Sequence, residues 1–580
     1  MPRTYTLDRF TQQIHDALVG SGEVLEEEFS LLTPPDNVAA DLGQPCFALA
    51  KRLRKAPAAI AAAIAADLAQ RAAFSADSLV DEVSAQGPYL NFTLAPQRLA
   101  ASVLAEVRKW GDDYGGDDMG AGRNVVLDYS SPNVARRMHI GHIRSTIIGQ
   151  AIRNLYDFLG YHTIGDNHLG DWGTQFGKLI HAYQAWGDQQ AMADDPIEHL
   201  VEIYARFHHE AKEHPELDDE GRKWFARLEE GDEEARQLWQ WFVDLTIQEF
   251  EKTYRRLGVR FDTYHGESFY EDMLDDVIQE AVEAGVARHD PDSPAVILDL
   301  TEHGLPTTLL RKSDGATLYL TRDIATALYR LHEYDPAWNL YIIGEPQTLH
   351  LRQLYKALEL MGYAEFAARC VHIPFGTLLK SDGSRFSMRE GDVIFLDELL
   401  DEAEVRARAI VEEKNPELRS EEKDEIARQV GIGALVYNDL HQDRRRDIVF
   451  DWDVMLSFEG NTAPYIQYTH TRCASVLEKG GGAPEAYEAT LLLEPAEQML
   501  VKQLAGFPGA VRRAAEAHAP HVIAEWLYNT AREFSRFWRD VSILQAPAGV
   551  REARLGLVDA VGQGLRNGLR LLGIEAPRKM

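Results

Sequence analysis

Cysteine is scarce in this 580-residue chain, which has only Cys46, Cys370 and Cys473. The three are far apart and show no CxxC spacing, which argues against a disulfide framework and against a structural zinc site. Such sparse cysteine favours a reducing compartment. We therefore expect a cytoplasmic protein without protein-bound zinc or another resident metal ion.

Long hydrophobic runs are missing as well. The Ala-rich segment near Ala58–Ala66 is too short to span a membrane, and Asp67 and Arg71 follow it. The N-terminus carries acidic residues soon after Arg3 and has no signal-peptide core. We therefore expect no membrane partner.

Positive charge is the third shortage, because 60 Lys and Arg residues face 92 Asp and Glu residues and give a formal net charge of −32. This balance argues against a protein that coats nucleic acid non-specifically. It is compatible with a nucleic-acid partner that binds to local basic patches. The hydrophobic share of 45% and the charged share of 26% are typical of a soluble globular protein, and a length of 580 residues predicts several domains.

The hydrophobic patterns divide the chain into three parts. Residues 1–115 alternate helical and strand-like segments and predict an α+β domain. We interpret the glycine- and acid-rich segment 111–122 as a linker that marks the boundary of this domain. Residues 116–400 predict an α/β domain with a helical insertion at about 185–290. Residues 401–580 are almost entirely helical in pattern and predict an all-α domain.

Three short apolar runs in the middle part are interpreted as strands: Ala295–Leu300, Leu318–Leu320 and Leu340–Ile343. Helical patterns lie between them. Alternation of this kind predicts βαβ units and a parallel sheet.

One strand-to-helix unit carries the clearest chemistry. The apolar run Asn124–Leu127 ends in a turn, and a helical pattern that Gly160 terminates begins after His139-Ile-Gly-His142. A helix N-terminus is a natural phosphate site, and Gly141 would let a flat ligand such as a purine lie against the backbone. His139 and His142 could donate hydrogen bonds to charge that builds up on a phosphate. The alternative is a pair of solvent-facing histidines at the start of a helix.

Several motifs together resemble the class I aminoacyl-tRNA synthetases, and the arginyl-tRNA synthetases in particular. They follow the order of that family along almost the whole chain. They are Gly87-Pro-Tyr-Leu-Asn-Phe92, Ser130-Ser-Pro-Asn133, His139-Ile-Gly-His142, Gly170-Asp-Trp-Gly-Thr-Gln-Phe-Gly177, Tyr319-Leu-Thr-Arg-Asp323, Asp447-Ile-Val-Phe-Asp-Trp-Asp453, Thr462-Ala-Pro-Tyr-Ile-Gln-Tyr468 and Ala576-Pro-Arg-Lys-Met580.

The resemblance implies a Rossmann-type catalytic domain, an N-terminal domain that contacts the elbow of a tRNA, and a helical bundle that reads the anticodon. It implies ATP as a substrate, Mg²⁺ with ATP, L-arginine and an arginine tRNA as partners, and a monomer. The implied reaction activates arginine as an adenylate and transfers it to the terminal ribose of the tRNA. The family typically needs its tRNA bound before it makes the adenylate.

A site for arginine follows from the same resemblance. A guanidinium is held best by carboxylates placed for bidentate hydrogen bonds. The matching positions are Asp128, Ser130, Asn133, Tyr319, Asp323 and Gln347. For Asp323 an N-cap role at the start of a helix is the competing interpretation.

The ATP site and the catalytic groups are likewise carried over from the family. The residues expected to bind ATP are His139, Gly141, His142, Phe386 and Ser387, and the catalytic groups are His139, His142, Arg136, Arg385, Ser387 and Arg389. The chain departs from the second class signature, because Met388 stands where a lysine usually neutralises the triphosphate. We expect Arg136, helped by Arg385 or Arg389, to supply the missing charge.

The resemblance also points to Tyr465, Tyr468, Arg472 and Met580 as contacts of the anticodon. Aromatic and guanidinium planes can stack on splayed bases of single-stranded RNA. A tyrosine at helical spacing can equally belong to the core.

Two other functions compete with an active arginine–tRNA ligase. One is a synthetase-like protein that binds tRNA but has lost catalysis, which Met388 alone supports. The other is a nucleotidyltransferase of the same superfamily that acts on a small molecule. The long helical C-terminal part argues against the latter, because a small acceptor would not need it.

Overall fold

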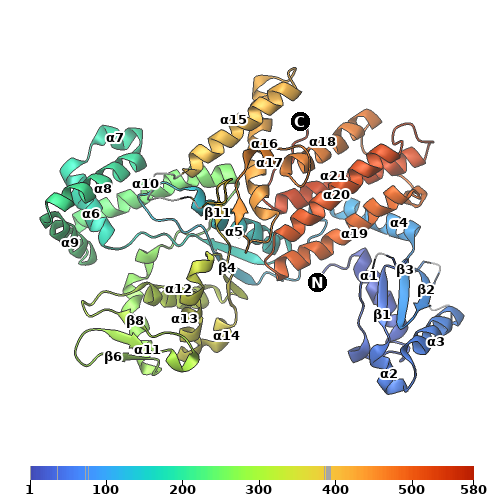
Figure 1. The fold of residues 1–580 in the computed structure, drawn as a ribbon, viewed down its shortest axis with the longest axis horizontal. Coiled ribbons are helices and arrows are strands. Elements are labelled where there is room, and N and C mark those ends of the chain that lie inside the picture. The colour runs from blue at the N-terminus through green and yellow to red at the C-terminus, as the bar shows by residue number, and fades with distance from the viewer. Residues whose placement is uncertain (1, 36, 72–73, 76, 385, 387–393) are drawn as a thin grey trace.

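The protein, seen in a computed structural model, is an elongated arrangement of three regions around a central parallel sheet (Figure 1). The structure describes residues 2–35, 37–71, 74–75, 77–384, 386 and 394–580. Within these ranges, no helix combines the length and the apolar character that crossing a membrane requires.

The N-terminal region is a small α+β unit whose antiparallel sheet has the strand order β1-β3-β2. Helix α3 packs against this sheet on the outer side of the unit, and α1 lies on the side nearer the rest of the chain (Figure 1). Its elements are α1 (Thr6–Leu18), β1 (Leu42–Pro45), α2 (Phe47–Leu53), α3 (Pro57–Gln70), β2 (Val80–Gln86), β3 (Tyr89–Leu94) and α4 (Pro96–Trp110).

The central sheet is fully parallel and has the strand order β10-β9-β4-β5. Its strands are β4 (Asn124–Asp128), β5 (His162–Asp166), β9 (Trp338–Tyr341) and β10 (Cys370–His372), and α5 (Ile140–Phe158) follows β4. The register pairs Asp128 with Asp166 on one side and with Tyr341 on the other. Because the carboxyl ends of parallel strands meet at one edge, these side chains gather there.

Two excursions leave this sheet. The first, a group of helices after β5, consists of α6 (Thr174–Trp186), α7 (Gln189–Asp194), α8 (Pro196–Glu213), α9 (Glu216–Glu229) and α10 (Glu233–Leu257). The second surrounds an antiparallel sheet and has its own core around Val296, Leu310 and Ile324. It consists of α11 (Leu274–Glu283), β6 (Ala287–His289), β7 (Val296–Leu298), β8 (Thr308–Arg311), α12 (Tyr319–Tyr334), α13 (Thr348–Leu358) and α14 (Ala364–Ala367).

Two strand predictions need correction in this second excursion. The run Leu318–Leu320 is not a strand, because α12 begins at Tyr319. The run Ala295–Leu300 does contain β7, but β7 pairs antiparallel with β6 and β8 and does not join the parallel sheet. A short apolar run indicates only that a segment is buried. It does not determine whether the segment forms a helix or a strand, or which strand it pairs with.

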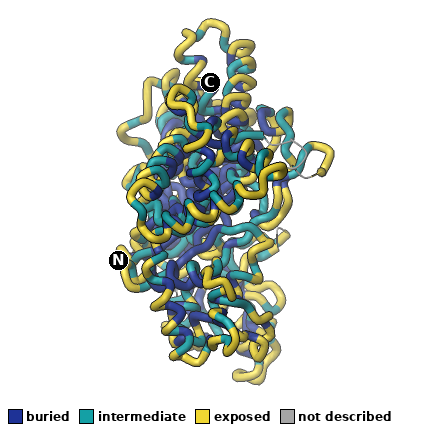
Figure 2. Tube along the Cα trace, turned by 90° about the vertical axis from the view of Figure 1, so that its left-hand side faces the viewer, coloured by how far each residue is buried: buried dark blue, intermediate teal, exposed yellow. Residues whose placement is uncertain are grey.

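The C-terminal region is helical and packs on α5 as well as on itself. Its elements are α15 (Leu396–Lys414), α16 (Ser420–Leu440), α17 (Trp452–Met455), α18 (Ala463–Gly480), α19 (Pro495–Glu516), α20 (His521–Asp540) and α21 (Val550–Leu571), and β12 (Ile448–Val449) pairs parallel with β11 (Leu378–Leu379). Buried residues run continuously through the interior, while exposed residues lie at the periphery (Figure 2).

The segment 111–122, which we interpreted as a linker, is packed between the N- and C-terminal regions. Tyr114 is buried, stacks on Phe507 and donates a hydrogen bond to the carbonyl of Leu504. Arg512 forms ion pairs with Asp8 and Asp117. The division of the chain near residues 115 and 400 stays a prediction.

Candidate active site at the carboxyl edge of the parallel sheet

The loop between β4 and α5 has an unusual backbone. Ser130, Ser131 and Ala135 adopt positive φ angles of 71°, 48° and 57°, which non-glycine residues rarely do. Side chains from other elements hold the loop in place: the Ser130 N–H donates to Ser145 Oγ at 3.0 Å, and the Ser131 N–H donates to Asn167 Oδ1 at 3.0 Å. Strain that its surroundings fix in this way is typical of functional loops.

The two signature histidines form a pair at the start of α5. His139 is the N-cap and its Nδ1 accepts the N–H of Gly141 at 3.1 Å, while the N–H of His139 donates to Nδ1 of His142 at 3.0 Å. Because each Nδ1 accepts, each ring carries its proton on Nε2 when it is neutral. Burial lowers the pKa of His139, with a further contribution from Arg136, and burial together with His139 lowers the pKa of His142 to about 4. Near neutral pH both rings are uncharged Nε2–H donors, and they are not two solvent-facing side chains.

Gly141 is required by this arrangement. A Cβ atom at this position would lie 2.8 Å from Cε1 and 3.0 Å from Nδ1 of His139. Any side chain would therefore push the His139 ring away from its hydrogen bond. The sequence analysis valued this glycine for ligand approach, and the structure adds a packing reason.

A cavity of about 430 Å³ opens beside this helix start. It brings together seven of the residues predicted from the sequence: Asp128, Ser130, Gly141, His142, Tyr319, Asp323 and Gln347. They come from β4, the loop after it, α5, α12 and the turn before α13, and the first and last of them, Asp128 and Gln347, are 219 residues apart in the sequence.

Asp323 lines the same cavity as His142 and is paired with a residue that the sequence analysis did not single out. Nε2 of His350 on α13 lies within hydrogen-bond distance of Oδ2 of Asp323. This hydrogen bond is the main reason why the pKa of His350 is raised above 6.5. The N-cap alternative for Asp323 is excluded, because α12 begins four residues earlier and Asp323 lies inside it.

Asp128 belongs to a buried charge cluster beneath the cavity. Nη2 of Arg330 donates to Oδ2 of Asp128 at 2.9 Å and to Oδ2 of Asp166 at 2.8 Å, and the three side chains are 1%, 6% and 3% exposed. The cluster holds two carboxylates and one guanidinium, so it carries one net negative charge. Burial opposes ionisation of Asp166, but Arg330 and its other partners outweigh it, so the pKa of Asp166 lies below 3.8.

Sequence reasoning missed Arg330 and Asp166. The available signal was weak: Arg330 is a charged residue on the otherwise apolar face of α12, with Thr326 and Ala327. A buried arginine is rarely left unpaired, so its position called for a carboxylate. Nothing in the sequence identified which carboxylates those are.

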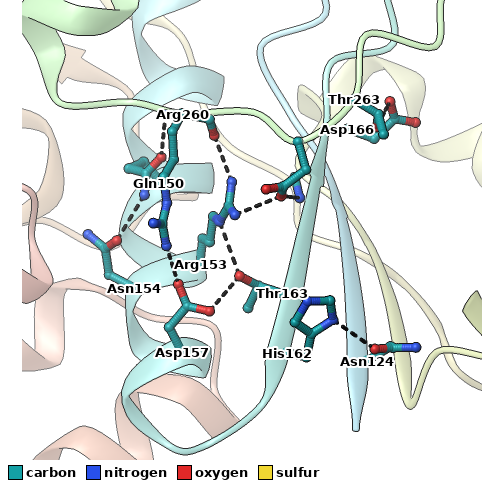
Figure 3. A network of polar contacts seen from close by, with 12 residues as sticks. Asn124, Gln150, Arg153, Asn154, Asp157, His162, Thr163, Asp166, Arg260 and Thr263 are labelled. Carbon is teal, nitrogen blue, oxygen red and sulfur yellow. Dashed lines mark hydrogen bonds and ion pairs between the residues drawn. The ribbon is translucent and has the colours of Figure 1, made fainter. Parts of the chain in front are cut away.

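A second network fixes β5 and with it Asp166 (Figure 3). Arg153 on α5 donates to Thr163 Oγ1 at 3.1 Å, to the carbonyl of Arg260 at 2.8 Å and to Asp262 Oδ2 at 2.7 Å. Thr263 Oγ1 then donates to Oδ1 of Asp166 at 2.7 Å. The segment after α10 thereby ties the signature helix to the charge cluster.

Other predicted residues lie outside this cavity. The Asn133 side chain is exposed and lies against Gly170. A Cβ atom at Gly170 would be only 2.1 Å from Oδ1 of Asn133. Arg136 is exposed and lines a separate cavity of about 230 Å³ with Lys252 and Arg256. His139 lies next to the cavity, with its ring centroid 4.0 Å from that of His142.

Of the second class signature, residues 385–389, the structure describes Phe386. Phe386 is half-buried, with Nζ of Lys380 5.9 Å from its ring centroid. Arg385, Ser387, Met388 and Arg389 lie outside the described residues.

The predicted anticodon contacts lie on and beside α18, far from this cavity. Tyr468 and Met580 line a cavity of about 370 Å³ together with Phe458 and Lys414. Arg472 stacks on Tyr468, with 4.7 Å between Cζ and the ring centroid.

Tyr465 differs from these residues. It is half-buried, and its hydroxyl lies 3.0 Å from Oγ of Ser535. The structure therefore groups Tyr468, Arg472 and Met580 and leaves Tyr465 against α20.

Three family models match successive parts of the chain. Residues 8–94 match the arginyl tRNA synthetase N terminal domain, residues 107–452 match the catalytic domain of class I tRNA synthetases (R), and residues 466–580 match the DALR anticodon binding domain. The second model alone covers more than half of the chain.

Curated relatives and solved structures agree with these models over the full length. An arginine–tRNA ligase of Chloroflexus aurantiacus is 49% identical over 580 residues and covers 99% of this chain and 100% of the relative. One from Halothermothrix orenii is 43% identical over 575 residues, covering 99% of each chain. The arginyl-tRNA synthetase of Thermus thermophilus superposes with a TM-score of 0.81 at 27% identity, over 98% of this chain and 99% of that one. With its signature histidines at the start of α5 and a helical C-terminal domain, this chain belongs to the class I arginyl-tRNA synthetases.

Proposed function

We propose that this protein is an arginine–tRNA ligase that activates L-arginine with ATP and transfers it to the 3′ end of an arginine tRNA for protein synthesis. The observation that carries the proposal is the 430 Å³ cavity, which Gly141 and His142 line together with Tyr319, Asp323 and Gln347. A nucleotide site and a cation site in one cavity suit the joining of a nucleotide to a cationic amino acid.

The cation-binding wall recognises the arginine side chain in this proposal. Asp323 accepts hydrogen bonds from the guanidinium, Gln347 takes a further N–H, and Tyr319, which is 67% exposed, offers its ring face or its hydroxyl. The negative charge of Asp128 and its buried cluster attracts the substrate from below. Ser130 and Asn133, in the loop before α5, hold the amino-acid end.

The nucleotide-binding wall lies at the N-terminus of α5. The adenine rests against Gly141, and the Nε2–H groups of His139 and His142 donate to the phosphates. A carboxylate oxygen of arginine attacks the α-phosphorus, the bond to the β-phosphate oxygen breaks, and pyrophosphate leaves. A hydroxyl of the terminal ribose then attacks the arginyl carbonyl, and AMP leaves with the bonding electron pair.

Charge on the leaving pyrophosphate has to be neutralised without the usual signature lysine. Arg136 supplies this charge in our proposal, together with Arg385 or Arg389, and Phe386 and Ser387 complete the ATP contacts. Mg²⁺ would accompany ATP as part of the substrate and would offset part of the charge on the phosphates. Among the described residues no group of three or more His, Cys, Asp or Glu side chains is placed to hold a metal ion.

The tRNA lies along the C-terminal helices and reaches the N-terminal sheet with its elbow. Tyr468, Arg472 and Met580 would contact the anticodon, and the 370 Å³ cavity between α15 and α18 is wide enough for a splayed base. Tyr465 acts through packing on α20. We further propose a cytoplasmic location, because all three cysteines are buried and form no disulfide, and a monomer, because the family resemblance implies one.

Arginine-dependent ATP–pyrophosphate exchange, run with and without arginine tRNA, tests this function. Exchange with arginine but not with lysine or ornithine, and only when the tRNA is present, is the expected result. The absence of exchange in both cases, with tRNA binding intact, would instead identify an inactive tRNA-binding protein. Recovery of exchange in the variant Met388→Lys would then identify the missing lysine as the cause.

A further inference from the structure

His350 occupies a carboxylate oxygen that the substrate guanidinium needs. Its Nε2 lies within hydrogen-bond distance of Oδ2 of Asp323, and both side chains are partly shielded, with exposures of 29% and 26%. His350 lies on the first turn of α13, three residues after Gln347, so both point into the cavity that Asp323 lines. A bidentate guanidinium requires both oxygens of its carboxylate partner.

The carboxylates in and beside this cavity carry a net negative charge that a cationic substrate partly offsets. The buried cluster of Asp128, Asp166 and Arg330 carries one net negative charge, and Asp323 adds a second. L-arginine brings positive charges on its α-ammonium and guanidinium groups and a negative charge on its carboxylate. A protonated His350 beside a guanidinium bound to Asp323 would place two cations on one carboxylate, and like charges repel.

Other titratable groups lie around the pair of His350 and Asp323. Tyr319 on α12, Tyr341 on β9, His142 on α5 and His168 after β5 line the cavity. Tyr355 on α13 and Glu267 after α10 interact electrostatically with Asp323, and Glu345 lies in the turn before α13. Burial raises the pKa of Tyr341 far above 10 and also raises that of Tyr355, so both tyrosines are neutral, while His142 is neutral because its pKa is about 4. Asp323 is the charged group that acts most directly on His350.

We propose that His350 is a placeholder for the substrate: it pairs with Asp323 in the free protein, and arginine displaces it from the carboxylate and releases its proton. The planar guanidinium can replace the lost hydrogen bond and add a second one. The ammonium of lysine is a point charge that cannot match both oxygens in the same plane. Because of His350, a ligand must form stronger hydrogen bonds to Asp323 than the imidazole does in order to bind. His350 is therefore a specificity-determining residue.

The proton count on binding tests this inference, which rests on the proposed function. Calorimetric titration of the full-length wild-type protein with L-arginine, in buffers of different ionisation enthalpy between pH 6 and pH 8, measures the number of protons released. We expect release of up to one proton near pH 6, falling toward zero at pH 8, and an apparent Kd that rises by about tenfold across this range as pH falls. This measurement needs no variant to fold.

The variant His350→Gln keeps a hydrogen-bond donor but cannot titrate. We expect it to bind arginine without proton release and with an apparent Kd that changes less than about twofold with pH, so that at pH 6 it binds arginine more tightly than the wild type does. A residue that only supported the structure would not improve binding when replaced. His303→Gln, at an exposed position on the surface, is the matched control and should behave as the wild type.

The alternative outcomes separate the two proposals. Arginine binding without proton release in the wild type, or pH dependence that persists in His350→Gln, overturns the placeholder role and leaves the ligase function intact. Proton release that disappears in His168→Gln and persists in His350→Gln assigns the effect to His168 and also overturns it. A folded wild-type protein that binds no arginine at any pH refutes the proposed function and the inference with it.

Discussion

Replacing Arg330 by methionine would leave two buried carboxylates without the cation that joins them. Asp128 and Asp166 are 6% and 3% exposed, and both bind the same guanidinium nitrogen. Methionine preserves much of the volume of arginine but offers no charge and no donor. The expected consequences are a less stable catalytic domain and weaker arginine binding.

The size of the stability loss follows from the burial. Removing one partner of a buried ion pair costs about 3–5 kcal/mol, because the remaining charge stays desolvated. With an unfolding entropy of about 2.1 cal/mol/K per residue over residues 107–452, this corresponds to a fall in Tm of about 4–7 °C for the catalytic unit. Proton uptake by one of the two carboxylates will limit the loss to this range.

The stability difference between the wild type and Arg330→Met should also depend on pH in a defined direction. The pKa of Asp166 in the folded protein lies below 3.8, so the stability that its ionised form contributes is present above pH 3.8 and is lost as the pH falls through its folded-state value. The difference in Tm between the wild type and Arg330→Met should therefore be full at pH 7 and narrow below pH 3.8.

Thermal unfolding followed by near-UV circular dichroism, together with the KM for arginine in tRNA-dependent exchange, would measure both effects. Arg369→Met is a suitable control, because Arg369 pairs with an Asp335 side chain that is 81% exposed, and surface pairs contribute about 0–1 kcal/mol. The double variant Arg330→Met/Asp166→Asn should recover part of the lost stability. If Arg330→Met melts within about 1 °C of the wild type and keeps its KM for arginine, the charge cluster does not have the role assigned to it.

Three further substitutions test other parts of the site. Gly141→Ala should lower the rate of exchange by about 10²-fold with little change in the KM for arginine, because the new methyl displaces the His139 ring; a normal rate would refute the packing argument. Arg136→Ala should cut adenylate formation by about 10²–10³-fold if this side chain neutralises pyrophosphate, and near-normal activity in presteady-state assays would exclude that role. Tyr468→Ala should raise the KM for tRNA in aminoacylation by about tenfold through loss of base stacking and leave the KM for ATP unchanged, whereas equal effects on both would argue for a packing role.

The local sequence determined the elements that carry the proposed nucleotide-binding wall. The apolar run before Ser130, the turn residues and the three- and four-residue spacing after His142 predicted β4 and α5, because such periodicity reports which face of a short element is buried. The same periodicity predicted the helical C-terminal region. The ordered motifs then identified the family, since they fix residue types at positions that hydrophobicity leaves open.

Tertiary structure alone decided which charges meet. Arg330 and Asp128 are 202 residues apart, and they come together because β4, β5 and α12 converge at one edge of the sheet. Strand order, the antiparallel pairing of β7 and the pairing of His350 with Asp323 depend on partners far along the chain, about which local patterns carry no information. A sequence pattern states that a side chain is buried or charged, and only the fold determines the group that it faces.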